Sequence, residues 1–232
     1  MNYHEVLKPT ICSGEVFDLL LSLGWYPMGQ KIFTTSHLFK DDGTTPMRVH
    51  WLRYPVTSVI ERTSHRRICS KNKYFDMELV DPFVHKKELD VLYDKYLSSV
   101  DFEGYPSIEK ATFRGEEVSD NIYNTKAIIM REGERIVSCG IFHEGVTSIA
   151  SVLHFYDPEY NRFSPGKYLI LKTLDYCRLQ GIEWYYPGYV IQGNSKMNYK
   201  LFLGQELAQY YFPDLTPLSG SWLPFRSDLL SK

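Results

Sequence analysis

The chain has 232 residues, of which 44% are hydrophobic and 15% aromatic, so it can bury a substantial core. Its formal net charge is −2 and its pI about 6.4, which excludes a globally basic nucleic-acid-binding protein and leaves only a local basic patch for such contact. No apolar run is long enough to span a bilayer, and residues 1–5 lack signal-peptide character. These features predict a cytoplasmic globular protein with no membrane partner.

The cysteines predict buried, reduced thiols. They stand at four isolated positions without a C-x-x-C pair, which disfavours both disulfides and a metal site: Cys12, Cys69, Cys139 and Cys177. His143 and Glu144, together with His154, are metal-binding residue types, but a hairpin pair or a surface histidine explains them better. We therefore expect no metal and no cofactor.

The first half alternates between helical and extended patterns. Apolar residues at helical spacing predict helices over 13–23, 64–71 and 86–98. Extended segments are predicted over 25–33, 48–54 and 75–80, with a turn over 39–46.

The second half is more regular. Alternating strands are predicted over 126–130, 135–142, 147–156 and 184–191. Between the last two lies a predicted helix with Ser164 as N-cap, Pro165 at its first position and Gly181 as its left-handed terminator. A strand that leads into a helix N-terminus, followed by a parallel strand, creates an anion site, and Ser164 and Gly166 would supply its N–H groups. Residues alone indicate an acyl or phosphate ligand here, without distinguishing the two.

This order of elements resembles the core of the GCN5-related N-acyltransferases, an α+β fold in which a splayed pair of parallel strands admits an acyl donor. The first half repeats a strand–helix order loosely, so we expect two related halves, residues 1–110 and 111–232. The boundary is predicted near 101–117, where Gly104, Pro106 and Gly115 cluster.

Three segments resemble the aminoacyl-tRNA–protein transferases of the N-degron pathway, that is, the arginyl-transferases and their bacterial leucyl-transferring relatives. The first runs from Ser13 to Gln30, and the second is Ser64-His65-Arg66-Arg67-Ile68 with Lys71-Asn72. The third comprises Phe155 to Pro158, Ser164 to Tyr168, Gly188-Tyr189 and Lys196-Met197-x-Tyr199-Lys200. Where many members carry closely spaced cysteines, between Phe33 and Arg48, this chain has none, which excludes a cysteine-bound cluster there.

The resemblance implies attack of a protein's α-amine on the ester of an aminoacyl-tRNA, with acceptor proteins that begin with an acidic residue. Alignment of the substrates and stabilisation of the oxyanion would then supply most of the acceleration. Whether arginine or leucine is transferred stays open at this point. An arginine pocket should present carboxylates and a leucine pocket should be apolar.

Each candidate site residue also has an ordinary structural explanation. Asp157, which could orient the amine or accept its proton, is equally well explained as the turn residue before Pro158. Tyr199 is the second catalytic candidate, through its hydroxyl. At i, i+3 and i+4, Lys196, Tyr199 and Lys200 would share one face of an α-helix. The substrate-binding candidates are Tyr156, Ser164, Gly166, Tyr189, Lys196 and Lys200. The tRNA-binding candidates are Arg62, Arg66, Arg67, Lys71 and Lys73, which could otherwise be a solvated helix surface.

Three other functions compete with this one. An acetyl-CoA-dependent N-acetyltransferase needs glycines where the chain has Pro165 and Lys167, which disfavours a normal coenzyme A loop. A non-catalytic module that binds N-termini or tRNA is compatible with the sequence, because no residue is an indispensable nucleophile. A relative with a cell-wall precursor as acceptor fits the third segment less well.

Overall fold

The computed structural model describes residues 3–40, 42–101, 104–115, 121–213 and 221–231. The α-helices are α1 (Gly14–Ser22), α2 (Thr63–Asn72), α3 (Lys86–Leu97), α4 (Ile108–Phe113) and α5 (Pro165–Gln180). The strands are β1 (His4–Leu7), β2 (Tyr26–Met28), β3 (Lys31–Thr35), β4 (His37–Phe39), β5 (Pro46–Pro55), β6 (Asp76–Val80), β7 (Thr125–Glu132), β8 (Arg135–Glu144), β9 (Ser148–Tyr156), β10 (Trp184–Ile191), β11 (Gln209–Tyr211) and β12 (Leu223–Pro224). Short 3-10 helices include η1 (Val56–Ser58), η3 (Pro158–Phe163), η4 (Ser195–Leu201), η5 (Gln205–Leu207) and η6 (Ser227–Leu230).

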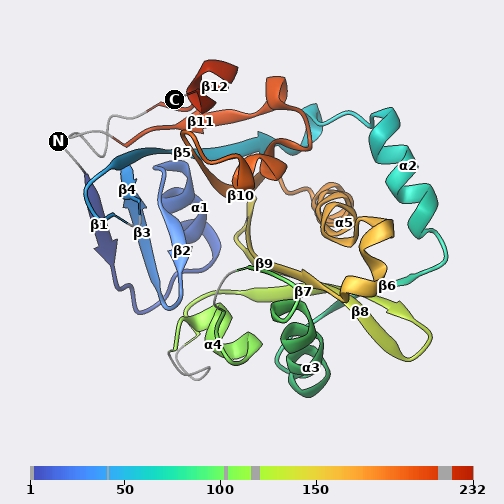
Figure 1. Cartoon of the computed structure of the whole chain (residues 1–232). Coiled ribbons are helices and arrows are strands. Elements are labelled where there is room, and N and C mark those ends of the chain that lie inside the picture. Colours follow the sequence, from blue (N-terminus) through green and yellow to red (C-terminus); the bar gives the residue numbers. More distant parts are fainter. Residues whose placement is uncertain (1–2, 41, 102–103, 116–120, 214–220, 232) are drawn as a thin grey trace.

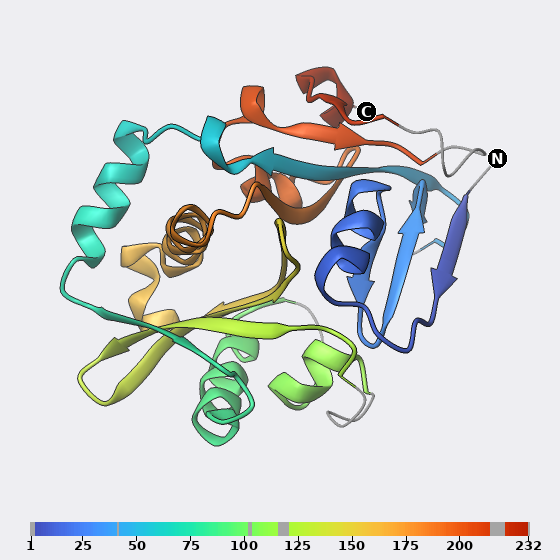
Figure 2. The same cartoon turned by 180° about the vertical axis from the view of Figure 1, so that it is seen from behind.

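A large sheet with the strand order β12-β11-β5-β10-β9-β8-β7-β6 forms the centre of the molecule, and β4 pairs with β5 beside it (Figure 1). A second sheet, β1-β3-β2, lies next to α1, as the view from behind shows (Figure 2). Helices cover both faces of β7 to β9. On one face Ile128 and Phe142 pack with Leu169 and Leu174 of α5, while α3 covers the other face. Burial on both faces explains why these strands are apolar almost throughout.

Strands β9 and β10 run parallel and then separate. Their ladder pairs Trp184 with Ser148, Tyr185 with Ile149 and Tyr186 with Ala150, and goes no further. Beyond it β9 pairs only with β8, while β10 bends toward β5 through an irregularity between Tyr185 and Gly188. Pro187 has no N–H to give to a ladder, which favours separation at this point. The splayed parallel pair predicted from the sequence is confirmed.

Most predicted elements are present, with two local corrections. Helix α5 ends at Gly181 in the left-handed conformation, as predicted, with a φ of +69°. Ser164 does occupy the N-cap position, but its φ is +56° and its side chain caps nothing, because η3 runs directly into α5. Helix α2 begins at Thr63, one residue before the start predicted at 64, and has Arg62 as its N-cap.

Both predicted halves, residues 1–110 and 111–232, contribute strands to the same large sheet. Strands β5 and β6 come from the first range, yet β5 lies between β11 and β10, and β6 pairs with β7. In the predicted boundary region, residues 102–103 and 116–117 lie outside the described residues, and α4 occupies the middle. The internal duplication stays a prediction.

The cysteines are free, and Cys12, Cys139 and Cys177 are buried as predicted, while Cys69 is half-buried. Within the described ranges, no helix combines the length and the apolar character that crossing a bilayer requires.

Candidate active site

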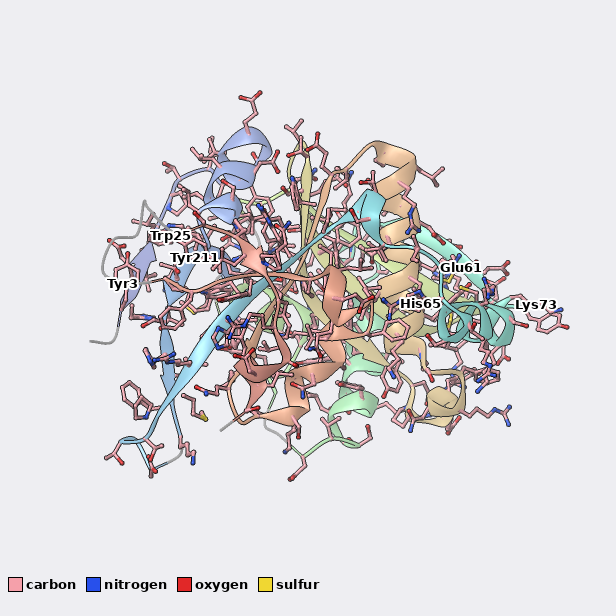
Figure 3. The ribbon with its side chains drawn as sticks, turned by 90° about the horizontal axis from the view of Figure 1, so that it is seen from above. Tyr3, Trp25, Glu61, His65, Lys73 and Tyr211 are labelled. Carbon is pink, nitrogen blue, oxygen red and sulfur yellow. The ribbon has the colours of Figure 1, made fainter. Side chains whose placement is uncertain are left out.

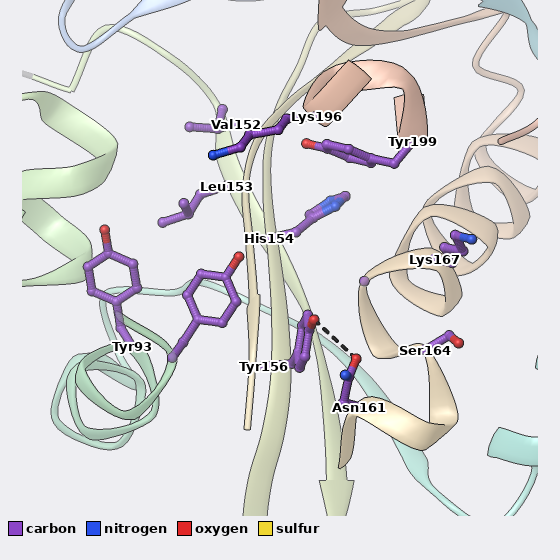
Figure 4. Close-up of a pocket in the computed structure, with 12 residues that line it drawn as sticks. Tyr93, Val152, Leu153, His154, Tyr156, Asn161, Ser164, Lys167, Lys196 and Tyr199 are labelled. Atoms are coloured by element: carbon purple, nitrogen blue, oxygen red, sulfur yellow. Dashed lines mark hydrogen bonds between the residues drawn. The ribbon is translucent and has the colours of Figure 1, made fainter. Parts of the chain in front are cut away.

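A cavity of about 600 Å³ opens where β9 and β10 separate (Figure 4). Helix α3, strand β9, the start of α5 and η4 form its walls. Most of the residues that line it have aromatic, aliphatic, amide or cationic side chains: Tyr93, Tyr96, Val152, Leu153, His154, Tyr156, Asn161, Ser164, Gly166, Lys167, Lys196 and Tyr199. We call this the large cavity. It contains four of the predicted substrate-binding residues together with Tyr199.

The N-terminus of α5 borders this cavity. Because no side chain caps the helix, its first N–H groups remain available to an anion. Gly166 lies beside the Tyr156 ring, and a Cβ there would make only an ordinary van der Waals contact with the ring, at 3.7 Å. The Ser164 side chain is turned away from the cavity (Figure 4), and its N–H donates to the Asn161 carbonyl at 2.9 Å. Of the two predicted N–H donors, Gly166 therefore remains the candidate.

The cluster after β10 corrects one prediction. Lys196, Tyr199 and Lys200 lie on the 3-10 helix η4, where residues three apart share a face and a residue four apart turns away. Lys196 and Tyr199 therefore reach over the large cavity (Figure 4), whereas Lys200 does not line it. The predicted common face of all three residues is wrong, because the spacing fits an α-helix and the segment is a 3-10 helix.

Lys200 lines a second, smaller cavity of about 220 Å³ between β2, the end of α4, β9 and β10. Its Nζ donates a hydrogen bond of 2.9 Å to the Tyr189 carbonyl and lies 4.9 Å from the centre of the Tyr189 ring. Burial lowers the pKa of Lys200 to about 8. We call this the small cavity; it also contains Tyr189, which packs edge-on against Trp51.

Gly188 makes room for the Lys200 ammonium. Its φ is +97°, a region that non-glycine residues rarely occupy, and a Cβ there would lie 3.1 Å from Lys200 Nζ. Substituting Gly188→Ala should therefore displace Lys200 and lower kcat/KM roughly tenfold, with a loss of about 1–2 kcal/mol in unfolding free energy. Steady-state kinetics and thermal melts would test this, with Gly133→Ala as control because Gly133 has a similar φ of +59° in an open turn. Equal kinetic losses in both variants would contradict the explanation.

The two cavities meet at Val152, Leu153, His154 and Tyr199, which line both. Burial, aided by the Lys200 charge, lowers the pKa of His154 to about 4, so the imidazole is neutral at pH 7. Its Nε2 lies 3.1 Å from Ser151 Oγ. From the sequence His154 had only been considered with His143, which is stacked on Tyr123 in the core. The position of His154 at the junction of the two cavities depends on where β9 and β10 separate, and residue spacing does not reveal that point.

Other residues of the site were also missed. Tyr93 and Tyr96 fall within the helix predicted over 86–98 without being candidate site residues, yet both line the large cavity. Tyr26 lines the small cavity, and its hydroxyl donates to the Tyr186 carbonyl at 3.1 Å and to the Ser151 carbonyl. The Tyr26 hydroxyl thus connects β2 with both separating strands.

Asp157 lies outside both cavities. Its carboxylate is completely buried beside a separate hollow, where it accepts hydrogen bonds from Lys95 at 3.0 Å and from Arg135. It also accepts from the Glu159 N–H at 3.0 Å, which caps η3. Burial raises the pKa of Asp157, but these hydrogen bonds and the Arg135 charge outweigh it, so the net shift is downward. Through these contacts the ionised Asp157 carboxylate connects α3, β8 and η3.

The predicted tRNA-binding residues lie on α2 or, for Arg62 and Lys73, directly at its two ends. Helix α2 packs against α5 and η3 at one side of the molecule (Figure 3). Arg66, Arg67, Lys71 and Lys73 are exposed. Arg62 differs from them because its guanidinium forms an ion pair with Glu206. Asn72 fixes the end of α2 near the large cavity by donating 2.9 Å hydrogen bonds to the Ile68 and Phe163 carbonyls.

Comparison with known proteins identifies the family. Residues 88–208, more than half of the chain, match the family described as "Arginine-tRNA-protein transferase, C terminus". The chain belongs to this family. It is therefore an aminoacyl-tRNA–protein transferase, an enzyme, as the resemblance in the sequence implied.

Relatives of this transferase extend the match to nearly the whole chain. The "Aspartate/glutamate leucyltransferase" of Aeromonas salmonicida is 26% identical over 222 residues, covering 94% of this chain and 84% of the relative. The protein of the same name from Shewanella sp. strain ANA-3 is 24% identical over 197 residues, covering 84% and 77%.

Solved structures support the acyltransferase-like fold of the transferase. FemX superposes with a TM-score of 0.52 at 11% identity, covering 84% of this chain and 65% of FemX. A protein of unknown function from Bacteroides thetaiotaomicron gives the same TM-score at 12% identity, covering 88% and 66%. The predicted α+β, acyltransferase-like fold is confirmed by these likenesses.

Proposed function

We propose that the enzyme transfers leucine from leucyl-tRNA to the α-amine of proteins that begin with Asp or Glu. The observation that carries the choice of leucine is the chemistry of the two cavities. Among the residues that the structure describes along their walls, none is an Asp or a Glu. A buried guanidinium needs carboxylate partners, whereas Val152, Leu153 and the tyrosine rings suit an aliphatic side chain.

The charges of the site support an acidic acceptor. Lys196 lines the large cavity and Lys200 the small one, so both cavities present cations to the junction. An N-terminal Asp or Glu would gain a charge-assisted hydrogen bond there, while a basic residue would be repelled. The relatives named aspartate/glutamate leucyltransferase agree with both substrates.

The donor tRNA fits the surface from α2 to the start of α5. The exposed cations of α2 would contact backbone phosphates, and the N–H group of Gly166 at the uncapped start of α5 would receive the phosphate of the terminal adenosine. Tyr156, whose hydroxyl is 3.5 Å from Asn161 Oδ1, would pack against the adenosine. Because charged tRNAs serve protein synthesis, this donor places the reaction in the cytoplasm.

In the reaction the α-amine nitrogen forms a bond to the ester carbonyl carbon, and the bond to the ribose oxygen breaks. The amine's ordinary pKa of ~7.7–8 leaves part of it unprotonated at neutral pH. Tyr199 stands at the junction, where its hydroxyl can donate to the developing oxyanion, and the proton lost by nitrogen leaves with the ribose hydroxyl. Asp157 acts in this scheme by holding the wall formed by α3 in place.

The Lys200 pKa of about 8 leads to a pH prediction. The ammonium predominates below this pH and is lost above it, so the KM for an acidic acceptor should rise as the pH increases from 7 to 9. Besides the Arg114 guanidinium, a permanent cation by type, the ionisable side chains that line the small cavity with Lys200 are uncharged in this range by type or by the His154 pKa of about 4: His154, Tyr26, Tyr189 and Tyr199. Lys200→Arg should keep its charge and lose this rise. A rise of equal size in both proteins would contradict the assignment.

A transfer assay tests the proposed function. The enzyme is incubated with tRNAs charged with leucine or arginine and with peptides that differ only in a first residue of Asp, Glu, Asn or Lys. Mass spectrometry of the peptides should show leucine on the Asp and Glu peptides and little on the others. Arginine as the preferred group, or equal transfer to Lys, would refute the proposal.

A further inference from the structure

Arg114, which the sequence had not singled out, lies on the wall of the small cavity at the end of α4. Its φ is +48°, and it is one of two described non-glycine residues with a positive φ. Such a conformation costs a non-glycine residue energy and is typically retained where function requires it. The strained backbone of Arg114 therefore suggests that its guanidinium has a function.

The turn between β2 and β3 holds Arg114 in place. Gly29, with a φ of +63°, packs so closely that a Cβ there would lie 2.8 Å from the Phe113 carbonyl oxygen and 3.1 Å from Arg114 Cβ. Phe113, the residue before Arg114, is completely buried. The backbone on which Arg114 stands is therefore fixed from both sides.

The Arg114 side chain has no counter-ion among the residues that the structure describes. Arg114 is an exposed residue at the rim of the small cavity, whereas the less exposed cations Lys95, Lys126 and Arg131 each contact a carboxylate. The described walls of the small cavity offer Arg114 only neutral groups and a second cation, Lys200. Two cations around one cavity, with no carboxylate among its described lining residues, favour an anionic ligand.

We propose that the small cavity binds the acidic side chain of the acceptor's first residue, with Arg114 and Lys200 as its counter-ions. The inference rests on the proposed function and adds the subsite and Arg114. At about 220 Å³ the cavity offers the space of about seven water molecules of ~30 Å³, which suits a single side chain rather than a nucleotide. The α-amine then lies at the junction, beside His154 and Tyr199.

The test is direct binding of peptides that begin with Asp, Glu or Asn, measured by calorimetry without tRNA. The wild type should prefer Asp and Glu, and Arg114→Gly should weaken their binding roughly tenfold while leaving the Asn peptide unchanged. Glycine adopts the left-handed backbone without strain. The melting temperature of Arg114→Gly should therefore be about 2–4 °C above that of the wild type, which shows that weaker binding is not caused by unfolding. Arg114→Lys should recover part of the preference.

Lys87→Gln, which removes an exposed cation of α3 that lines neither cavity, is the matched control and should bind like the wild type. An unchanged preference in Arg114→Gly would overturn the subsite, as would equal binding of all three peptides to the wild type. A preserved preference that depends on Arg114, combined with transfer of arginine instead of leucine, would overturn the proposed donor and leave the subsite standing.

Discussion

Asp157→Asn should destabilise the enzyme by about 2–3 kcal/mol. Breaking a fully buried ion pair typically costs 3–5 kcal/mol, but here only the carboxylate is buried, with Lys95 and Arg135 39% and 52% exposed. Asparagine can still accept the Glu159 N–H, but Lys95 and Arg135 lose their buried counter-ion and keep the exposed Glu159 carboxylate, at 2.9 and 4.0 Å. At 2–4 °C per kcal/mol, the melting temperature should fall by about 4–12 °C.

The control for this prediction is Asp175→Asn. Asp175 also pairs with two cations, Lys172 at 2.9 Å and Arg178 at 3.2 Å, but it is 47% exposed, so its loss should cost at most about 1 kcal/mol. Equal melting temperatures for the two variants would contradict the structural role of Asp157. An Asp157→Asn enzyme that melts like the wild type but has lost kcat would instead support the catalytic role first considered for this residue.

The effect of Asp157→Asn should depend on pH in a defined direction. The folded protein lowers the pKa of Asp157 below its ordinary value of ~3.9. The stabilisation is therefore fully present above about pH 4 and is lost as the pH falls toward the lowered folded value. Urea unfolding at pH 7 and pH 3 should accordingly show a smaller difference between wild type and variant at pH 3.

Reversing two charges on α2, with Arg66→Glu and Arg67→Glu together, should weaken tRNA binding roughly hundredfold at low salt. Both side chains are exposed, and Arg66 has only a distant pairing with Glu61 at 4.0 Å, so the fold should be unaffected. If each contacts a phosphate, the slope of log K against log salt should decrease by about two. Fluorescence anisotropy with labelled tRNA across a salt series would measure both quantities.

The matched control is the double reversal of Lys8 and Lys87 to Glu, two exposed cations away from α2. It changes the net charge by the same amount and should alter the affinity far less. If both double variants lose affinity equally, the attraction arises from the net charge of the protein, and α2 is not the tRNA surface.

The sequence predicted the second half of the fold better than the first, for physical reasons. Strands β7 to β10 and helix α5 combine strong periodicity with clear end signals such as Pro165 and Gly181. The short elements β11 and β12 were missed because their stability comes from pairing, β11 with β5 and β12 with β11, rather than from local pattern. The short helix α4 was missed for a similar reason, since its apolar residue Phe113 is buried by tertiary contacts.

The site was predicted in composition but not in arrangement. The segment Lys196 to Lys200 was identified, yet spacing does not distinguish an α-helix from a 3-10 helix. Because the segment is a 3-10 helix, Lys200 lines the small cavity instead of the large one. His154 and Arg114 have no local signal at all. Their importance arises from where β9 leaves β10 and from the contact of α4 with the turn at Gly29.

The most direct test of the account is the structure of the enzyme with a stable amide analogue of leucyl-adenosine 5′-phosphate. The account predicts the leucyl carbonyl at the junction beside Tyr199 and His154, with the phosphate at the N-terminus of α5. Binding of the analogue elsewhere, or a junction filled by the protein's own side chains in its presence, would contradict it.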